Sequence, residues 1–186
     1  MLIKNPFVLY VARFIGAFCI LYYGTQGVIG LAAPGRYYSG FIHDYLNYPV
    51  LLRNSLLYGA RFFLSLFGYD ALVHHTFFIS MVGGRGVRMV YSCLGIGLIS
   101  FWTAFVYANK GNLTKKLVWI TGGLMLIWLI NITRVALLLL AINKKWPMPL
   151  HLDNHTWFNI AAYTAIFILV YFYHRSSKKY LKTSDG

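Results

Sequence analysis

The sequence predicts an all-α polytopic membrane protein. Hydrophobic residues make up 59% of the 186 residues and charged residues only 11%, whereas a soluble domain averages about 25% charged residues. The mean hydropathy is +0.59. Apolar runs long enough to cross a bilayer alternate with short basic segments. The length suits a single membrane domain over residues 1–186, and neither an internal repeat nor a second, soluble domain is evident.

About four apolar runs are predicted to cross the membrane. The first run follows Lys4 and exceeds the apolar region of a signal peptide, about 7–15 residues, so we expect it to be retained. Arg13 within it is near enough to the cytoplasmic end to extend toward the interface. The predicted transmembrane helices cover residues 7–33, 93–109, 117–141 and 155–174.

Residues 49–69 are apolar as well, but their pattern favours an interfacial or re-entrant helix. Arg53 and Arg61 are eight residues apart, which places them within about 80° of each other on a helix. A helix with such a cationic face lies in the membrane interface. If this segment also crossed the membrane, the later basic segments would face outward, against the positive-inside tendency.

Residues 76–91 predict a small β-hairpin. Two short β-prone runs flank Gly83 and Gly84, a pair typical of a tight turn. The hairpin leads directly to Cys93, and we expect it on the extracytoplasmic side.

The charge distribution fixes the predicted orientation and narrows the partners. Lys and Arg total 17 against four acidic residues, a net charge of +13, and the chain contains no Glu. The basic residues form short clusters between apolar runs, which suits anionic lipid headgroups rather than nucleic acid. We therefore expect a protein of the inner (cytoplasmic) membrane, with the N- and C-termini and the loop at residues 110–116 cytoplasmic. A mechanism built on two carboxylates has few candidate residues.

Three polar residues from separate segments reach one membrane depth in this topology. Cys93 lies at the outer start of its helix, Arg134 toward the outer end of the next, and His155 at the outer start of the last. Each alone has an ordinary explanation: Cys93 could be a packing residue, Arg134 could extend to the interface, and His155 could be an interfacial residue. A cation favours the thiolate form of cysteine and can hold an oxyanion, and a histidine can transfer the protons. Together the three suit acyl transfer through a thioester.

The segments "YSCLGIG", "NITR" and "HTWFNIAAY" resemble the three motifs of the exosortase/archaeosortase family, in order and in topology. That family consists of polytopic membrane cysteine enzymes that act as proteases or transpeptidases. The resemblance covers about the second half of the chain. One departure is Leu94, because many members read Cys-Ser-Gly at this place.

The resemblance implies that Cys93 is the nucleophile, Arg134 the thiolate partner or oxyanion stabiliser, and His155 the general acid/base. Asn131 precedes Arg134 by three residues on one helix face and would orient Arg134 or the substrate. The implied substrates are exported proteins with a C-terminal transmembrane sorting signal, cut at the outer face. Because the chain is shorter than typical members of the family, it is compatible with a protein that acts together with an accessory membrane subunit. Arg85 and Arg88 on the hairpin would contact substrate or lipid headgroups.

Two other classes of protein stay open at this point. A non-catalytic assembly or lipid-binding subunit would scatter the three polar residues over different faces. A small anion transporter would use Arg134 but gives Cys93 no role. No cofactor is expected. The segment "HLDNH" (His151, Asp153, His155) suggests a metal site only weakly, since no fourth ligand is evident. Cys19, in the middle of the first apolar run, is expected to be a packing residue.

Overall fold

The structure is a computed structural model that describes residues 5–35, 37–74, 77–146 and 154–184. Within the last segment, side chains are described at position 156 and at positions 159–176. Helices make up 75% of the molecule and a small three-stranded sheet completes it. The helices are α1 (Pro6–Ala32), α2 (Gly40–Tyr45), α3 (Tyr48–Ser65), α4 (Ile96–Ala108), α5 (Leu113–Lys144) and α6 (Asn154–Ser184); the strands are β1 (Ala71–His74), β2 (Phe78–Met81) and β3 (Gly86–Arg88); and the 3₁₀ turn is η2 (Tyr91–Leu94).

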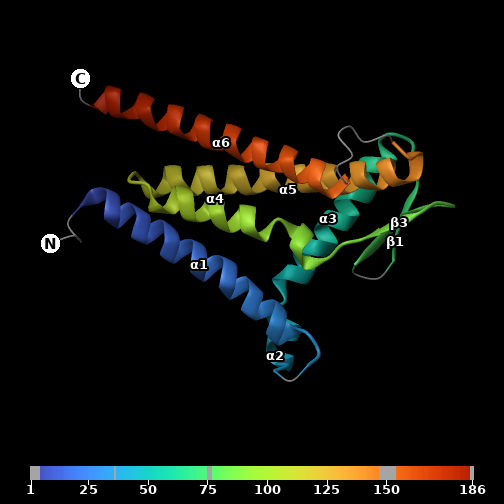
Figure 1. The fold of residues 1–186 in the computed structure, drawn as a ribbon. Helices are drawn as coiled ribbons and strands as arrows, with labels where there is room; N and C mark the ends of the chain where they lie inside the picture. The colour runs from blue at the N-terminus through green and yellow to red at the C-terminus, as the bar shows by residue number, and fades with distance from the viewer. Residues whose placement is uncertain (1–4, 36, 75–76, 147–153, 185–186) are drawn as a thin grey trace.

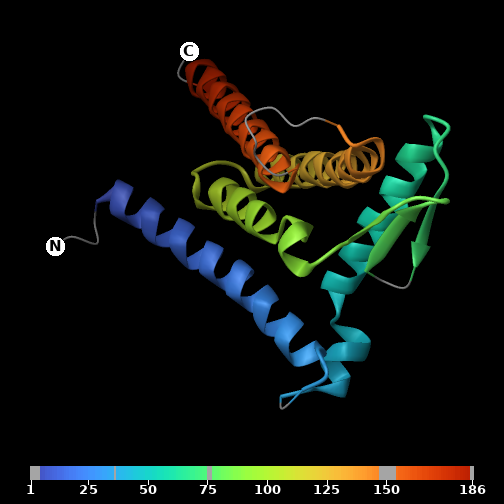
Figure 2. The ribbon, with the colours of Figure 1, turned by 45° about the vertical axis from the view of Figure 1, so that its right-hand side comes forward.

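Helices α1, α4, α5 and α6 extend from the same side of the molecule, with α1 and α6 on either side of α4 and α5, whereas α3 runs across the far part of α5 (Figures 1 and 2). Both termini lie at one end of the bundle, which we call the terminal end. The sheet and α3 lie at the opposite end, which we call the sheet end. In the described part of the chain, α1 and α5 are long and apolar enough to cross a membrane, and α4 is a shorter apolar helix. The predicted number of four crossings stays a prediction.

Helices α1 and α5 begin at side-chain caps. The Asn5 side chain accepts a hydrogen bond from the Phe7 N–H (3.0 Å) at the start of α1. Asn112 does the same for the Thr114 N–H (3.0 Å) at the start of α5. Each asparagine satisfies one of the free donors of a helix N-terminus, so these boundaries follow from the local sequence.

The sheet contains the predicted hairpin and one further strand. Strands β2 and β3 pair antiparallel, with Phe78 opposite Arg88, and the turn between them includes Gly83 at φ 69°. Strand β1 adds to the other edge, with Ala71 opposite Met81. The sequence analysis missed β1 because four residues, "ALVH", are too short to show a strand pattern. It also missed α2, a six-residue helix between α1 and α3.

Helix α3 lies across the sheet-end half of α5 and does not run beside α1 (Figures 1 and 2). Gly59 permits the close approach, because a Cβ there would overlap the Ile132 side chain of α5. Trp128 on α5 donates its indole N–H to the Ser55 hydroxyl of α3 (3.0 Å). The resulting core joins α3, α5, the sheet and η2: Leu56, Leu57, Ala60, Leu64, Ala71, Ile79, Met89, Leu94, Ile96, Ile132, Val135, Ala136, Leu139 and Leu140.

The two arginines of α3 differ from expectation. The sequence analysis placed Arg53 and Arg61 on one cationic face, but Arg53 is only 8% exposed whereas Arg61 is exposed. The spacing explains the difference, because Arg53 also shares its face with Leu56, Leu57 and Ala60, which enter the core.

Candidate active site

Cys93 lies in a 3₁₀ turn that follows the hairpin. Val90 is extended, and the Cys93 N–H donates to the Val90 carbonyl (2.9 Å) within η2. We had expected Cys93 to begin a helix over residues 93–109, but α4 begins at Ile96. Gly95 explains the offset, because its φ of 73° is left-handed and interrupts the helical path. Cys93 therefore occupies a tight turn just ahead of α4.

Gly95 also brings this turn against α5. A Cβ at position 95 would overlap the side-chain nitrogen of Asn131. Asn131 is only 1% exposed, and its Oδ1 atom is buried without a hydrogen-bond partner among the described residues. An unsatisfied buried acceptor costs free energy. The cysteine turn thus packs closely against Asn131 of α5 at Gly95. The Oδ1 atom of Asn131 remains able to accept a hydrogen bond.

Arg134 lies one turn along α5 from Asn131 and is 9% exposed. It lines a cavity of about 470 Å³, which we call the Arg134 cavity. Ser92 and Gly95, on either side of Cys93, line the same cavity. The Cys93 side chain itself is half-buried and packs against the core of α3 and α5. Arg134 and the two residues nearest to Cys93 in the lining, Ser92 and Gly95, thus share one cavity.

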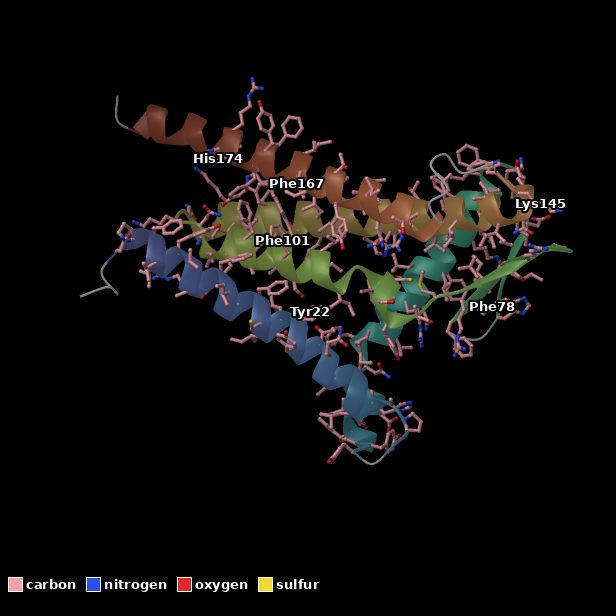
Figure 3. The ribbon with its side chains drawn as sticks, in the orientation of Figure 1. Tyr22, Phe78, Phe101, Lys145, Phe167 and His174 are labelled. Atoms are coloured by element: carbon pink, nitrogen blue, oxygen red, sulfur yellow. The ribbon has the colours of Figure 1, made fainter. Side chains whose placement is uncertain are left out.

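The rest of the Arg134 cavity is built by α1, α4 and α6. Its walls are largely aromatic, and Figure 3 labels Tyr22 on α1, Phe101 on α4 and Phe167 on α6. Polar residues Gln26 and Asn159 line it as well. The cavity therefore combines a polar region beside the cysteine turn with an apolar region between the long helices.

The third predicted catalytic residue cannot be placed in the same way. Position 155 belongs to the first turn of α6, but the His155 side chain lies outside the described residues. Residues 147–153, which include His151 and Asp153, lie outside them too. Asn159, four residues after position 155 on the same helix, does line the cavity. The meeting of Cys93, Arg134 and His155 stays a prediction.

The hairpin arginines have separate environments. The main chain of Arg85 pairs with the Asn143 side chain, which accepts from the Arg85 N–H (2.7 Å) and donates to its carbonyl (3.0 Å). Asn143 thereby ties the hairpin to the end of α5. The Arg88 guanidinium lies 5.1 Å from the centre of the Phe77 ring. Both arginine side chains are exposed, which suits a contact with substrate or headgroups.

Sequence reasoning missed the pair formed by Arg53 and Tyr91. The Arg53 guanidinium lies 4.9 Å from the centre of the Tyr91 ring and 6.0 Å from that of Phe77. Cations over aromatic faces are attracted, more strongly where they are desolvated. Tyr91 is the first residue of the turn that contains Cys93. The apolar spacing of Leu56 and Leu57 after Arg53 was the signal that could have revealed its burial.

Metal ligands and the second cysteine can be described briefly. Within the described ranges, no group of three or more His, Cys, Asp or Glu residues could hold a metal ion. Cys19 is a free, half-buried thiol in α1.

Comparisons with known proteins identify the family. The family model described as Transmembrane exosortase matches residues 14–172, well over half of the chain. Archaeosortase A from Natronomonas pharaonis is 35% identical over 63 residues, and the alignment covers 34% of this chain and 20% of that protein. No solved structure matches this chain. With a family model that spans most of its length, the chain belongs to the transmembrane exosortase family.

Proposed function

We propose that the protein is a membrane cysteine protease or transpeptidase that cleaves C-terminal sorting signals of exported proteins. The observation that carries the proposal is the junction of the Cys93 turn with Arg134, at a cavity that is polar on one side and aromatic on the other. Such a cavity suits a peptide bond at the boundary between an exported segment and a membrane anchor. Family membership supports the same reaction.

The chemistry proceeds through a thioester. The Cys93 thiol gives its proton to His155, and the thiolate forms a bond to the scissile carbonyl carbon. The guanidinium of Arg134 donates hydrogen bonds to the oxyanion that results. Collapse of this intermediate breaks the C–N bond, and His155 protonates the departing amine. An amine or water then attacks the thioester, gives its proton to His155 and releases the Cys93 thiolate. Asn131 positions the turn through its contact with Gly95.

The proposed orientation places the sheet end outside the cytoplasm. Both termini lie at the other end of the bundle (Figure 1). Lys110 lies in the loop between α4 and α5 at that terminal end, Lys115 and Lys116 lie in the first turn of α5, and Arg175 lies in the last third of α6. Basic residues on the cytoplasmic side follow the positive-inside tendency. The catalytic turn then faces the outer interface, where a membrane anchor emerges from lipid.

Replacement of the nucleophile tests the function. In a strain carrying Cys93→Ala, we expect exported proteins with a C-terminal anchor to accumulate as uncut precursors, because no thioester can form. Quantitative proteomics of membrane fractions measures the precursors, and immunoblotting confirms that the variant is present at the wild-type level. Normal processing in that strain would contradict the proposal.

A non-catalytic lipid-binding subunit is the second candidate. The aromatic wall of the Arg134 cavity favours it, because acyl chains would pack between α1 and α6 as readily as a peptide anchor. This candidate predicts that Cys93→Ala leaves processing unchanged, whereas enlargement of Ala162 in the cavity wall to Phe changes lipid binding. The two outcomes separate the candidates.

A further inference from the structure

Tyr91 separates the Arg134 cavity from a second cavity of about 490 Å³. This second cavity, which we call the Asn47 cavity, is enclosed by the end of α1, by α2 and by the start of α3. Among the described residues, Tyr91 is the one that lines both cavities. Cys93 follows Tyr91 by two residues in the same turn, and its side chain packs against the core without lining either cavity.

The Asn47 cavity offers both hydrogen-bond donors and acceptors. Arg53, more than nine-tenths buried, is part of its wall. The Oδ1 atom of Asn47 is buried and has no hydrogen-bond partner in the described part of the chain. Although Asn47 is the residue before α3, its side chain does not cap that helix. His43 and Asp44 line the cavity as well and pair with each other, 2.8 Å between Nδ1 and Oδ1.

Both cavities are lined mostly by apolar atoms, but the wall of the Asn47 cavity contains three side chains of the Arg, Asp and His types and that of the Arg134 cavity contains one. The Arg134 cavity continues between long apolar helices, with Phe18, Phe101 and Phe167 in its walls. The Asn47 cavity lies around α2, at the end of α1 and the start of α3 (Figure 1), and its wall combines apolar residues such as Pro34, Val50 and Leu51 with an acid, a histidine, an amide and an arginine. An anchored substrate is apolar on the leaving-group side of the scissile bond and polar on the acyl side.

We propose that the Asn47 cavity binds the acyl-side segment of the substrate, in an extended conformation, while the anchor side occupies the Arg134 cavity. This inference rests on the proposed function and adds where each half of the substrate binds. The substrate main chain crosses Tyr91, which brings the scissile carbonyl to Cys93. An N–H group of the segment donates to Asn47 Oδ1, and an oxygen of the segment accepts from Arg53.

The lining favours a peptide over a lipid headgroup. A phosphodiester carries acceptors and a negative charge, so it could use Arg53 but would meet the Asp44 carboxylate and could donate nothing to Asn47. An extended peptide carries alternating N–H and C=O groups and needs no net charge. The mixed lining of the cavity matches that pattern.

Arg53 also connects this cavity to the hairpin. Phe77 lies between two guanidinium groups, 6.0 Å from that of Arg53 and 5.1 Å from that of Arg88. Arg53 in turn lies over Tyr91 at 4.9 Å. A ligand in the Asn47 cavity would therefore change the surroundings of the Tyr91 ring, and Tyr91 is the first residue of the cysteine turn.

Site-specific photocrosslinking tests the placement. The probe is the exported protein whose precursor accumulates in the Cys93→Ala strain. A photoreactive phenylalanine analogue replaces Asn47 in one Cys93→Ala variant and Phe167 in another, and mass spectrometry maps the adducts. We expect position 47 to label precursor residues on the N-terminal side of the anchor, and position 167 to label the anchor itself. The reverse pattern, adducts of position 47 with phospholipid, or no precursor adduct at position 47 would overturn the inference.

A kinetic comparison provides a second test. In proteoliposomes with the full chain and this precursor, Asn47→Ala should raise KM about 5- to 10-fold, as expected for one lost hydrogen bond of about 1 kcal/mol, and leave kcat unchanged. Asn54→Ala is the matched control, because Asn54 lies in α3, the helix that follows Asn47 in the chain, but lines neither cavity. An unchanged KM in Asn47→Ala would overturn the inference. Processing without Cys93 would instead refute the proposed function, so the two failures are distinguishable.

Discussion

The two ends of the bundle differ in the polar groups that they bury. At the terminal end, Trp102 is fully buried, its indole N–H donates to the Trp119 carbonyl (3.0 Å), and the Tyr173 ring meets both indoles edge-on. At the sheet end, the buried side chains near the cysteine turn include Asn131 and Arg134. Apolar packing with satisfied polar groups stabilises a fold, whereas buried polar groups cost free energy unless they are paired. The sheet end also contains the larger apolar core, so what distinguishes it is the presence of buried polar side chains beside the cysteine turn, where the proposed reaction would take place.

The sharpest test of this contrast is Arg134→Lys. Lysine keeps the charge but loses the planar set of donors, so we expect processing to slow by about 10²-fold or more, as for the loss of one oxyanion donor. The rate of precursor processing in proteoliposomes measures the effect. Arg61→Lys, an exposed arginine of α3, is the matched control and should change the rate less than about twofold. Equal losses in the two variants would remove the special role of Arg134.

Two glycines, one at each end, test whether activity and stability separate. Gly95→Ala places a side chain at a left-handed φ, at a cost of about 1–2 kcal/mol, and pushes Asn131 away, so activity should fall about tenfold or more. Gly123→Ala overlaps the indole of Trp102, which costs about 1–3 kcal/mol of stability, but should leave the activity per folded molecule unchanged. Thermal unfolding in detergent and processing rates measure the pair. Parallel losses of both quantities in both variants would show that the two ends are not separable.

The sequence predicted the helical membrane class and the hairpin from composition, apolar run length and the glycine pair, and the structure contains the hairpin. These features depend on residues that are close together in the chain, so the sequence alone can predict them. The position of Cys93 ahead of α4 was not predictable, because Gly95 could equally have continued the helix. Strand β1 was missed because its pairing partner, β2, is what stabilises it.

For the candidate site, the sequence identified Cys93, Asn131 and Arg134 from motifs, and the structure places Arg134 and the Cys93 turn around one cavity. Arg53 and Asn47 were not found as site residues. The role proposed for them depends on a cavity formed by α1, α2 and α3 together. No spacing within one helix encodes such a cavity.

The smallest expected effect belongs to the other cysteine. Cys19 lies in the middle of α1 and does not line the Arg134 cavity. A half-buried thiol acts as a small apolar group, so Cys19→Ala should leave both the processing rate and the thermal midpoint nearly unchanged. A loss of processing in Cys19→Ala would place essential thiol chemistry away from the sheet end. The variant also leaves Cys93 as the single thiol for labelling.

That single-thiol variant permits the most direct test of the central claim, that Cys93 forms a covalent thioester. The Cys19→Ala protein is mixed with precursor in proteoliposomes, quenched in acid within the first turnover and analysed by mass spectrometry. The account predicts an acyl adduct on the peptide that contains Cys93, and its loss on treatment with hydroxylamine. Precursor cleavage that proceeds at the wild-type rate after complete alkylation of Cys93 would contradict it.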